Sequence, residues 1–278
     1  MTLKRPTLIV CLIGMWASLL GAQQSGAQRA AWNRPLPPFH ILGNIHYVGV
    51  AGVSAYLIVT PDGSILLDGG LPETAPQIVQ NIAALGFRIG DVKYLLNSHA
   101  HFDHAGGLAE LKRLSGAQMV ASAGDAPALR AGTPDMPAVV IDRVIGDGDT
   151  LGLGGTTLTA LVTPGHTQGC TTWAMTTTDG GRAYRVLFYC STSVVDRLVG
   201  NAQYPNIVAD YEQTFVRVRS LMADVFLSNH PEFFQLERKR AQMKTGGPNP
   251  FVDPGELQRF VATSERTFRE TLARESQR

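Results

Sequence analysis

The sequence predicts an α/β domain in which two β-sheets pack face to face and helices cover their outer surfaces. The chain has 278 residues, is 44% hydrophobic and 17% charged, and is therefore long and apolar enough for a sizeable core. Its two halves, which meet near residue 150, show a similar order of strands and helices. A single four-layer domain over 23–278 lets every sheet face and helix stripe bury its apolar side.

The first half begins with a β-meander. Residues 41–67 alternate apolar and polar side chains and are interrupted at 61–63 by Pro-Asp-Gly, which is turn chemistry. Apolar residues at helical spacing predict a helix over 73–85, with a proline near its start and a glycine after its end. Residues 92–96 are typical of a short buried strand, and 107–114 return to helical spacing.

The second half follows a proline-containing loop and repeats this order. Its three predicted strands are at 156–162, 171–176 and 185–189. Asp210, with Gln213 three residues later, resembles a capping box and predicts that a helix opens there. A strand at 225–227 and an amphipathic helix from about Pro254 to the end complete the half.

The N-terminus is typical of a secretory signal peptide. A basic pair at 4–5 precedes an apolar run over 8–20, and small residues follow. The run is shorter than the roughly 20 residues that span a bilayer, although a retained anchor is the alternative. We predict that residues 1–22 are removed, or that cleavage follows Ala27, and that the mature protein is periplasmic.

The charge balance argues against a nucleic-acid partner. The whole chain has 24 Lys and Arg against 23 Asp and Glu, a net charge of +1. Loss of the basic pair at 4–5 makes it −1, whereas nucleic-acid binding needs a basic surplus. We expect a monomer that acts on a small molecule and has no membrane association after the signal is removed.

Two of the three cysteines are expected to pair. Cys11 leaves with the signal peptide, so Cys170 and Cys190 remain in an oxidising compartment. We predict a disulfide between them, and two buried thiols are the alternative.

The densest cluster of metal-ligating side chains follows the predicted strand at 92–96. It places His99, His101, Asp103 and His104 within six residues, just before two glycines. Side chains at i and i+2 of an extended segment project to the same side, so His99 and His101 can bind one ion. Asp103 and His104 come around the next turn and face a second ion. Imidazole and carboxylate ligands suit zinc.

Each ion needs at least one further protein ligand. His166 and His230 both follow predicted strands of the second half and would reach the same rim, whereas the isolated His40 and His46 are ordinary polar residues. We therefore predict two zinc ions per chain. The first is held by His99, His101 and His166, and the second by Asp103, His104 and His230.

At these residues the chain resembles the metallo-β-lactamase superfamily, whose signature is a His-x-His-x-Asp-His loop on an αββα fold with two mixed sheets. Asp68-Gly69-Gly70 and Gly165-His166 match as well. The chain is most similar to subclass B3, in which all six ligands are His or Asp and a serine replaces the cysteine ligand of subclass B1. Here Ser191 occupies that position and Cys190 precedes it, so Cys190 as a zinc ligand is an alternative.

The resemblance implies hydrolysis of the amide bond of penicillins, cephalosporins and carbapenems by a metal-bound hydroxide, and hence antibiotic resistance. Glyoxalase II enzymes and many acyl-homoserine lactonases of this fold use a bridging aspartate that residues 187–193 lack. Since the same ligands serve many hydrolyses, an exported di-zinc lactonase or esterase is the alternative. A periplasmic zinc-binding protein without turnover is a further one.

The resemblance also implies roles for residues around the metals. Asp103 would act catalytically by orienting the hydroxide, and Asp68 would hydrogen-bond the backbone or imidazoles of the metal loop. A plain turn role is the alternative for Asp68. Ser191 and Ser193 resemble the hydroxyls that hold the β-lactam carboxylate in this subclass, although loop hydroxyls are common without such a role.

Overall fold

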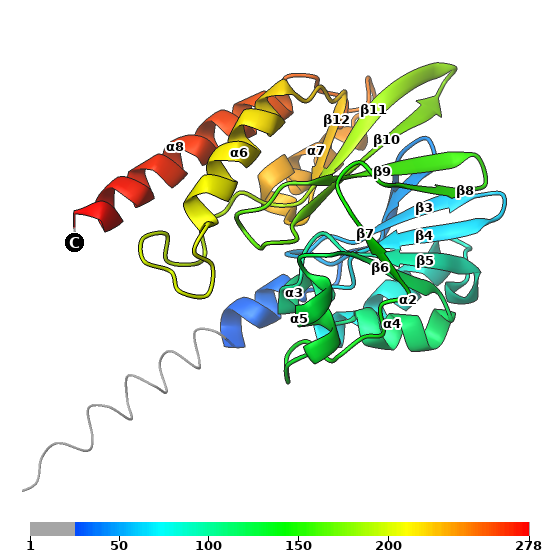
Figure 1. Cartoon of the computed structure of the whole chain (residues 1–278). Helices are drawn as coiled ribbons and strands as arrows, with labels where there is room; N and C mark the ends of the chain where they lie inside the picture. Colours follow the sequence, from blue (N-terminus) through cyan, green and yellow to red (C-terminus); the bar gives the residue numbers. More distant parts are fainter. Residues whose placement is uncertain (1–25, 278) are drawn as a thin grey trace, which may run out of the picture.

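The computed structural model describes residues 26–277, so the predicted signal peptide lies outside the described residues. Within this range, no helix is both long and apolar enough to cross a membrane. The described chain forms two sheets, with helices on the outer side of each (Figure 1). The four-layer α/β arrangement predicted from the sequence is thereby confirmed.

The first sheet has seven strands in sequence order. They are β1 (Phe39–Leu42), β2 (Ile45–Tyr47), β3 (Tyr56–Thr60), β4 (Gly63–Leu67), β5 (Val92–Leu96), β6 (Gln118–Ser122) and β7 (Arg143–Ile145). The pairs from β1 to β4 are antiparallel, whereas those from β4 to β7 are parallel. The carboxyl ends of β4, β5 and β6 therefore lie at one edge, where the loops after them meet.

The second sheet has five strands in the order β12-β11-β10-β9-β8. They are β8 (Thr150–Leu153), β9 (Thr156–Val162), β10 (Thr171–Asp179), β11 (Arg182–Tyr189) and β12 (Val225–Ser228). All pairs are antiparallel except β11 with β12. Both sheets are thus mixed.

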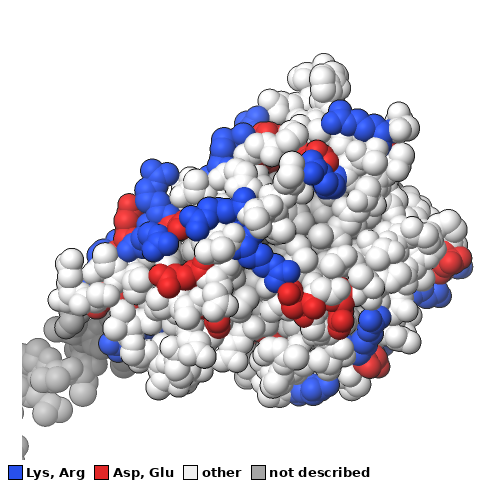
Figure 2. Space-filling view, turned by 45° about the horizontal axis from the view of Figure 1, so that its top comes forward, with Lys and Arg blue, Asp and Glu red and all other residues white. Residues whose placement is uncertain are grey.

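Helices cover both outer faces (Figure 1). On the side of the first sheet lie η1 (Pro72–Thr74), α2 (Ala75–Ala84), η2 (Ile89–Asp91), α3 (Phe102–Ala105), α4 (Leu108–Ser115) and α5 (Ala126–Ala131). On the side of the second lie α6 (Ile207–Ser220) and α8 (Glu256–Ser276), whereas η3 (Pro231–Phe234) and α7 (Leu236–Met243) follow β12 and contact β3 and β1 of the first sheet. A short helix over 26–32 precedes them all. On the face in Figure 2, both basic and acidic side chains are present.

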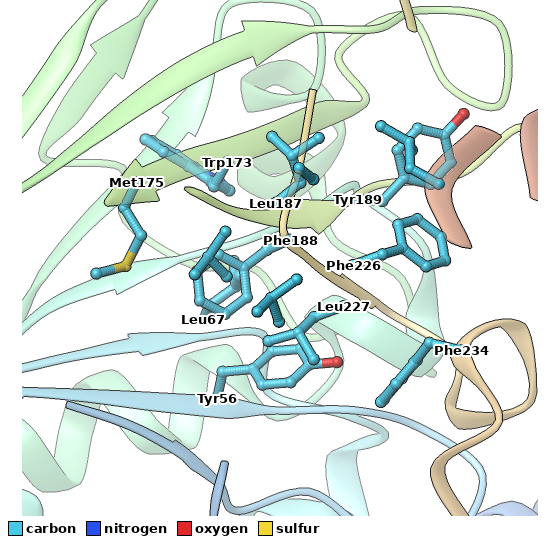
Figure 3. Close-up of a cluster of buried hydrophobic side chains, with 14 of the residues drawn as sticks. Tyr56, Leu67, Trp173, Met175, Leu187, Phe188, Tyr189, Phe226, Leu227 and Phe234 are labelled. Carbon is cyan, nitrogen blue, oxygen red and sulfur yellow. The ribbon is translucent and has the colours of Figure 1, made fainter. Parts of the chain in front are cut away.

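The alternation of side chains along the strands produces two buried layers. Tyr56 on β3 points into the space between the sheets, where it meets Phe188 of β11 at a ring-centroid distance of 5.1 Å (Figure 3). The neighbouring Leu57 points the other way and packs under the helices of the first sheet. The Tyr56 hydroxyl donates to the carbonyl of Ser228 at 2.6 Å, which joins β3 directly to β12. The loops that follow these two sheets are therefore fixed relative to each other.

Two details of the sequence interpretation are wrong. The segment between the predicted helix at 107–114 and the predicted strand at 156–162, expected to be a proline-containing loop, contains β6, β7, β8 and α5. Pro127 lies in the first turn of α5, where a missing N–H costs nothing. The predicted capping box is also absent. Helix α6 begins at Ile207, and the Asp210 carboxylate accepts a hydrogen bond from the Tyr204 hydroxyl at 2.6 Å.

Candidate metal centre

The first cluster of ligands lies at the carboxyl end of β5, where the sequence predicts it. His99 and His101 are in the extended segment after the strand, and α3 then carries Asp103 and His104. The loop is held to β4, because the backbone N–H of Gly69 donates to the His104 carbonyl at 2.7 Å. A one-turn helix after an extended segment thus presents four ligand side chains from six residues.

The other two histidines reach the same place from the second sheet. His166 follows β9, and His230 follows β12. The turn before His166 requires glycine, since Gly165 has φ +131° and a Cβ there would lie 2.7 Å from the Tyr211 ring. Three loops from two sheets therefore converge on one rim.

The first set of ligand atoms comes from His99, His101 and His166. The Nε2 atoms of His99 and His166 are 3.1 Å apart, and the ring of His101 lies 4.6 Å and 4.7 Å from theirs. One nitrogen from each of the three lies within 4.8 Å of the others.

The second set comes from Asp103, His104 and His230. The Nε2 atoms of the two histidines are 3.2 Å apart, and Asp103 Oδ2 lies 3.2 Å from His104 Nε2 and 3.5 Å from His230 Nε2. The rings of His99 and His104 are 4.5 Å apart, so the two sets are adjacent.

These spacings fit zinc. Bonds of about 2.0–2.1 Å in a tetrahedral arrangement place neighbouring ligand atoms roughly 3.3 Å apart, close to the separations in both sets. Each set supplies three donors of the kind that zinc prefers and leaves a fourth position for water. The residues present therefore fit two metal ions.

The protonation of three of the histidines also favours metal binding, whereas Asp103 raises the pKa of His104 against the effect of burial. Burial lowers the pKa of His166 to about 3 and that of His230 to about 4, and it lowers the pKa of His99 well below its usual value. All three are neutral at pH 7, which is the form that binds a metal. Burial raises the pKa of Asp103, but His104 and His230 outweigh it, so this carboxyl is ionised.

The far nitrogens of the rings are fixed by the protein. His166 Nδ1 donates to the Ser193 carbonyl at 2.7 Å, and His230 Nδ1 donates to the Gly52 carbonyl at 3.1 Å. Each bond leaves the Nε2 lone pair directed into the site. His99 Nδ1 faces the Ser98 hydroxyl at 3.1 Å.

Asp68 lies directly under the metal loop. Its Oδ1 accepts the backbone N–H of Ser98 at 2.6 Å, and its Oδ2 is 3.8 Å from His104 Nδ1. Burial raises the pKa of Asp68 to about 6, although His104 and Ser98 act to lower it. The carboxylate therefore contacts the loop that carries four ligands, as expected for a supporting residue.

The two serines have different environments. Ser191 is 1% exposed, and its hydroxyl accepts the backbone N–H of Ser193 at 3.1 Å. Ser193 is half-buried, and its carbonyl accepts from His166 and, at 2.6 Å, from the Tyr211 hydroxyl. Of the two residues with predicted substrate-binding hydroxyls, only Ser193 is partly exposed.

Cys170 and Cys190 form the predicted disulfide, with their Cα atoms 5.9 Å apart. Cys190 Sγ lies 3.8 Å from His99 Nδ1, on the side of the ring away from the converging Nε2 atoms. Because this sulfur is bonded to Cys170, the alternative in which Cys190 binds zinc does not fit the structure.

Two further residues contact the site. Trp32 packs its ring 5.7 Å from that of His230 and 6.5 Å from that of Phe102, which is 38% exposed beside the metal loop. Asp125, at the start of α5, contacts both loops of the first set. An aspartate before Ala-Pro is a helix-start signal, but it does not indicate contacts with distant loops.

Comparisons with known proteins agree with this geometry. Residues 48–176 match the family model described as the metallo-beta-lactamase superfamily. The solved structure of BJP-1, a subclass B3 metallo-β-lactamase of Bradyrhizobium japonicum, is 44% identical with a TM-score of 0.86, covering 88% of this chain and 97% of that one. Native FEZ-1 metallo-β-lactamase from Legionella gormanii is 37% identical with a TM-score of 0.85, covering 87% and 98%.

The similarity to curated proteins is more limited in extent. A hydroxyacylglutathione hydrolase of Rhodospirillum rubrum is 34% identical over 98 residues, 35% of this chain and 34% of that protein. The chain thus spans about a third of the length of the curated relatives it matches.

Proposed function

Because the chain belongs to the metallo-β-lactamase superfamily and resembles its subclass B3 members, we propose that it hydrolyses the amide bond of β-lactams with two zinc ions. Penicillins, cephalosporins and carbapenems are the proposed substrates, and resistance to them is the proposed role. The observation that carries the proposal is the pairing of two three-ligand sets without a cysteine ligand, in a chain that covers 97% of a subclass B3 enzyme at 44% identity.

In this proposal His99, His101 and His166 hold the first zinc, and Asp103, His104 and His230 hold the second. When bound, the ions supply an activated water at neutral pH and polarise the lactam carbonyl. The imidazoles of the first set are neutral, so on that side of the site only the metal ion would carry a charge. Asp103 adds a carboxylate to the second set only, so the two sets are inequivalent.

Asp103 is the proposed catalytic residue. It is ionised and lies at the junction of the two sets, where it can accept a hydrogen bond from the attacking water and hold it towards the carbonyl. Ser193 offers a hydroxyl to the substrate carboxylate. Ser191 acts through Ser193, since its buried hydroxyl accepts the Ser193 N–H and fixes that turn.

An exported lactonase or esterase is the second candidate, favoured by the likeness of part of the chain to hydroxyacylglutathione hydrolases. By their name, those relatives hydrolyse a hydroxyacylglutathione rather than a β-lactam. The metal ligands alone do not determine which of these substrates is hydrolysed. Against this candidate, residues 187–193 at the end of β11 contain no carboxylate, whereas the resemblance implies an aspartate there in glyoxalase II enzymes and many lactonases.

A direct comparison of substrates tests the proposal. Residues 23–278 would be purified, loaded with zinc, and assayed with a penicillin, a carbapenem, an acyl-homoserine lactone and a hydroxyacylglutathione thioester. We expect kcat/KM for both β-lactams to exceed that for the lactone and the thioester by at least tenfold. Faster hydrolysis of the lactone or thioester would overturn the β-lactamase proposal and leave a zinc-dependent hydrolase. Detection of cleavage after residue 22 in the periplasmic fraction would test the proposed export.

A further inference from the structure

The first set of ligands depends on two loops that belong to different sheets. His99 and His101 follow β5 of the first sheet, whereas His166 follows β9 of the second. The three nitrogens meet only if these loops keep a fixed separation. Asp125 lies between the loops, just after β6, and is 3% exposed.

The Asp125 carboxylate hydrogen-bonds both loops at once. Its Oδ2 accepts the backbone N–H of Ala100 at 2.8 Å and the hydroxyl of Thr167 at 3.0 Å. Its Oδ1 accepts the backbone N–H of Gly169 at 2.9 Å. Ala100 separates His99 from His101 in the sequence, and Thr167 directly follows His166. One side chain therefore contacts the neighbours of all three ligands.

The glycine at position 169 allows Asp125 to approach the backbone of the His166 loop. A Cβ on Gly169 would lie 2.6 Å from Cγ of Asp125 and 2.3 Å from its backbone nitrogen, so only glycine permits the contact. The Ser122 hydroxyl donates to the Gly169 carbonyl at 2.6 Å. The segment from Ser122 to Asp125 thus holds the end of the His166 loop on two sides.

Asp125 has a counterpart on the other side of His99. Asp68 accepts the N–H of Ser98, and Asp125 accepts the N–H of Ala100, so a buried carboxylate fixes the amide on each side of this ligand. A buried carboxylate is costly unless its oxygens are hydrogen-bonded, and both of these are bonded to loop amides.

We propose that Asp125 is a positioning residue that sets the distance between the two loops of the first metal set and thereby the metal affinity of that set. This inference rests on the proposed metal centre. The carboxylate does not touch the metal or the substrate. It acts by accepting three hydrogen bonds, which an amide of the same shape cannot all accept.

The test compares Asp125→Asn with Asp142→Asn. In Asp125→Asn, the new amide N–H₂ faces either Gly169 or Ala100, which leaves one loop without its acceptor. Asp142 is the control, because it also accepts a backbone N–H, that of Met119 at 2.6 Å, but it does so at the opposite end of β6, where it is exposed and pairs with Lys112. Zinc dissociation constants would be measured by chelator competition, and the geometry of the first set by the d–d absorption of the cobalt(II) form.

We expect Asp125→Asn to raise the dissociation constant of the first-set ion about 10- to 100-fold, the range for lost supporting hydrogen bonds, and to change the cobalt spectrum. Asp142→Asn should leave both unchanged. A folded Asp125→Asn protein with wild-type zinc affinity and spectrum would overturn the inference.

If Asp125→Asn does not fold, Thr167→Ala replaces it. This change removes one of the three donors, and we expect a severalfold rise in the same dissociation constant, whereas an unchanged value would overturn the inference. Failure of the proposed metal centre can be distinguished from failure of the inference about Asp125. A wild-type chain that binds no zinc would remove the metal centre itself, whereas tight wild-type binding with an unaffected variant removes only the role of Asp125.

Discussion

The Nε2 atoms of His104 and His230 lie 3.2 Å apart, although the two residues follow strands of different sheets and are 126 positions apart in the chain. Their approach depends on the packing of the sheets, since Tyr56 of β3 donates to the Ser228 carbonyl just before His230. Both sheets therefore contribute to the second set of ligands, and its geometry depends on how the two sheets pack.

Loss of His230 should remove the second metal ion. In His230→Ala, only Asp103 and His104 remain in that set, and we expect about one zinc per chain and a kcat at least 100-fold lower. Metal analysis after gel filtration and steady-state kinetics would measure both. His40→Ala is the control, because the His40 ring bonds its own hairpin at Gly43. Two tightly bound zinc ions in His230→Ala would contradict the assignment.

The metal-free protein should lose stability as the pH falls. His166 has a folded pKa of about 3 and His230 of about 4, both lowered mainly by burial, against about 6.5 in the unfolded chain. Between these values the unfolded chain binds more protons. The free energy of unfolding therefore rises with pH in this window, and this contribution is lost as the pH falls from about 6.5 towards 4.

Asp68 acts in the opposite direction over part of the same range, because burial raises its folded pKa to about 6. His104 also acts in the opposite direction, because burial lowers its pKa but the Asp103 carboxylate outweighs burial and raises it. The informative quantity is consequently the difference between the wild type and His166→Asn. The free energy of unfolding of both chelated proteins would be measured with urea from pH 4 to 7. We expect it to depend less steeply on pH in the variant, by a slope that corresponds to up to about one bound proton. Equal slopes would show that His166 is not held neutral.

A buried ion pair joins α7 to α8. Lys239 is 1% exposed, pairs with Glu256, and lies over the rings of Phe234 and Phe251 at 5.8 Å and 5.3 Å. Lys239→Met would leave the Glu256 carboxylate buried without its cation, and we expect a loss of about 3–5 kcal/mol in the free energy of unfolding. Denaturant unfolding would measure it.

The double variant Lys239→Met/Glu256→Leu separates the ion pair from packing. Because it removes both charges, it should recover most of the stability lost in the single variant. A double variant as unstable as Lys239→Met would mean that the aliphatic contacts of Lys239, rather than its pairing with Glu256, hold the helices together.

Ser193 should affect substrate binding more than turnover. Ser193→Ala removes the hydroxyl but keeps the carbonyl that accepts from His166 and Tyr211. We expect KM for a penicillin to rise severalfold, with kcat little changed. A methyl ester of the same penicillin lacks the carboxylate, so its KM should not change. Equal KM values for the wild type and the variant with the free acid would exclude the role.

The sequence predicts the candidate metal ligands better than the residues that hold the ligand loops in place. His99, His101, Asp103 and His104 are neighbours in the chain, so their spacing alone indicates an ion site. His166 and His230 were found because each follows a strand, and strand ends meet at a rim. The disulfide was predicted from the two cysteines that remain once the predicted signal peptide is removed.

Features that depend on contacts between distant segments could not be predicted in this way. Asp125 lies 25 residues from Ala100 and 44 from Gly169, and no local pattern relates them. Asp210 matched a capping box in composition, but Tyr204 binds its carboxylate and the helix opens at Ile207. Strands β6 and β7 were missed because their parallel neighbours stabilise short segments that have weak patterns of their own.

We propose that two zinc ions held by these six side chains enable the protein to hydrolyse β-lactams. The decisive measurement is the stepwise addition of zinc to chelated protein, with hydrolysis of a penicillin followed at each step. We expect no activity in the metal-free protein, a rate of hydrolysis that changes as zinc is added up to two equivalents per chain, and a constant rate beyond that. Binding of two zinc ions without detectable β-lactam hydrolysis, or hydrolysis that survives chelation, would contradict it.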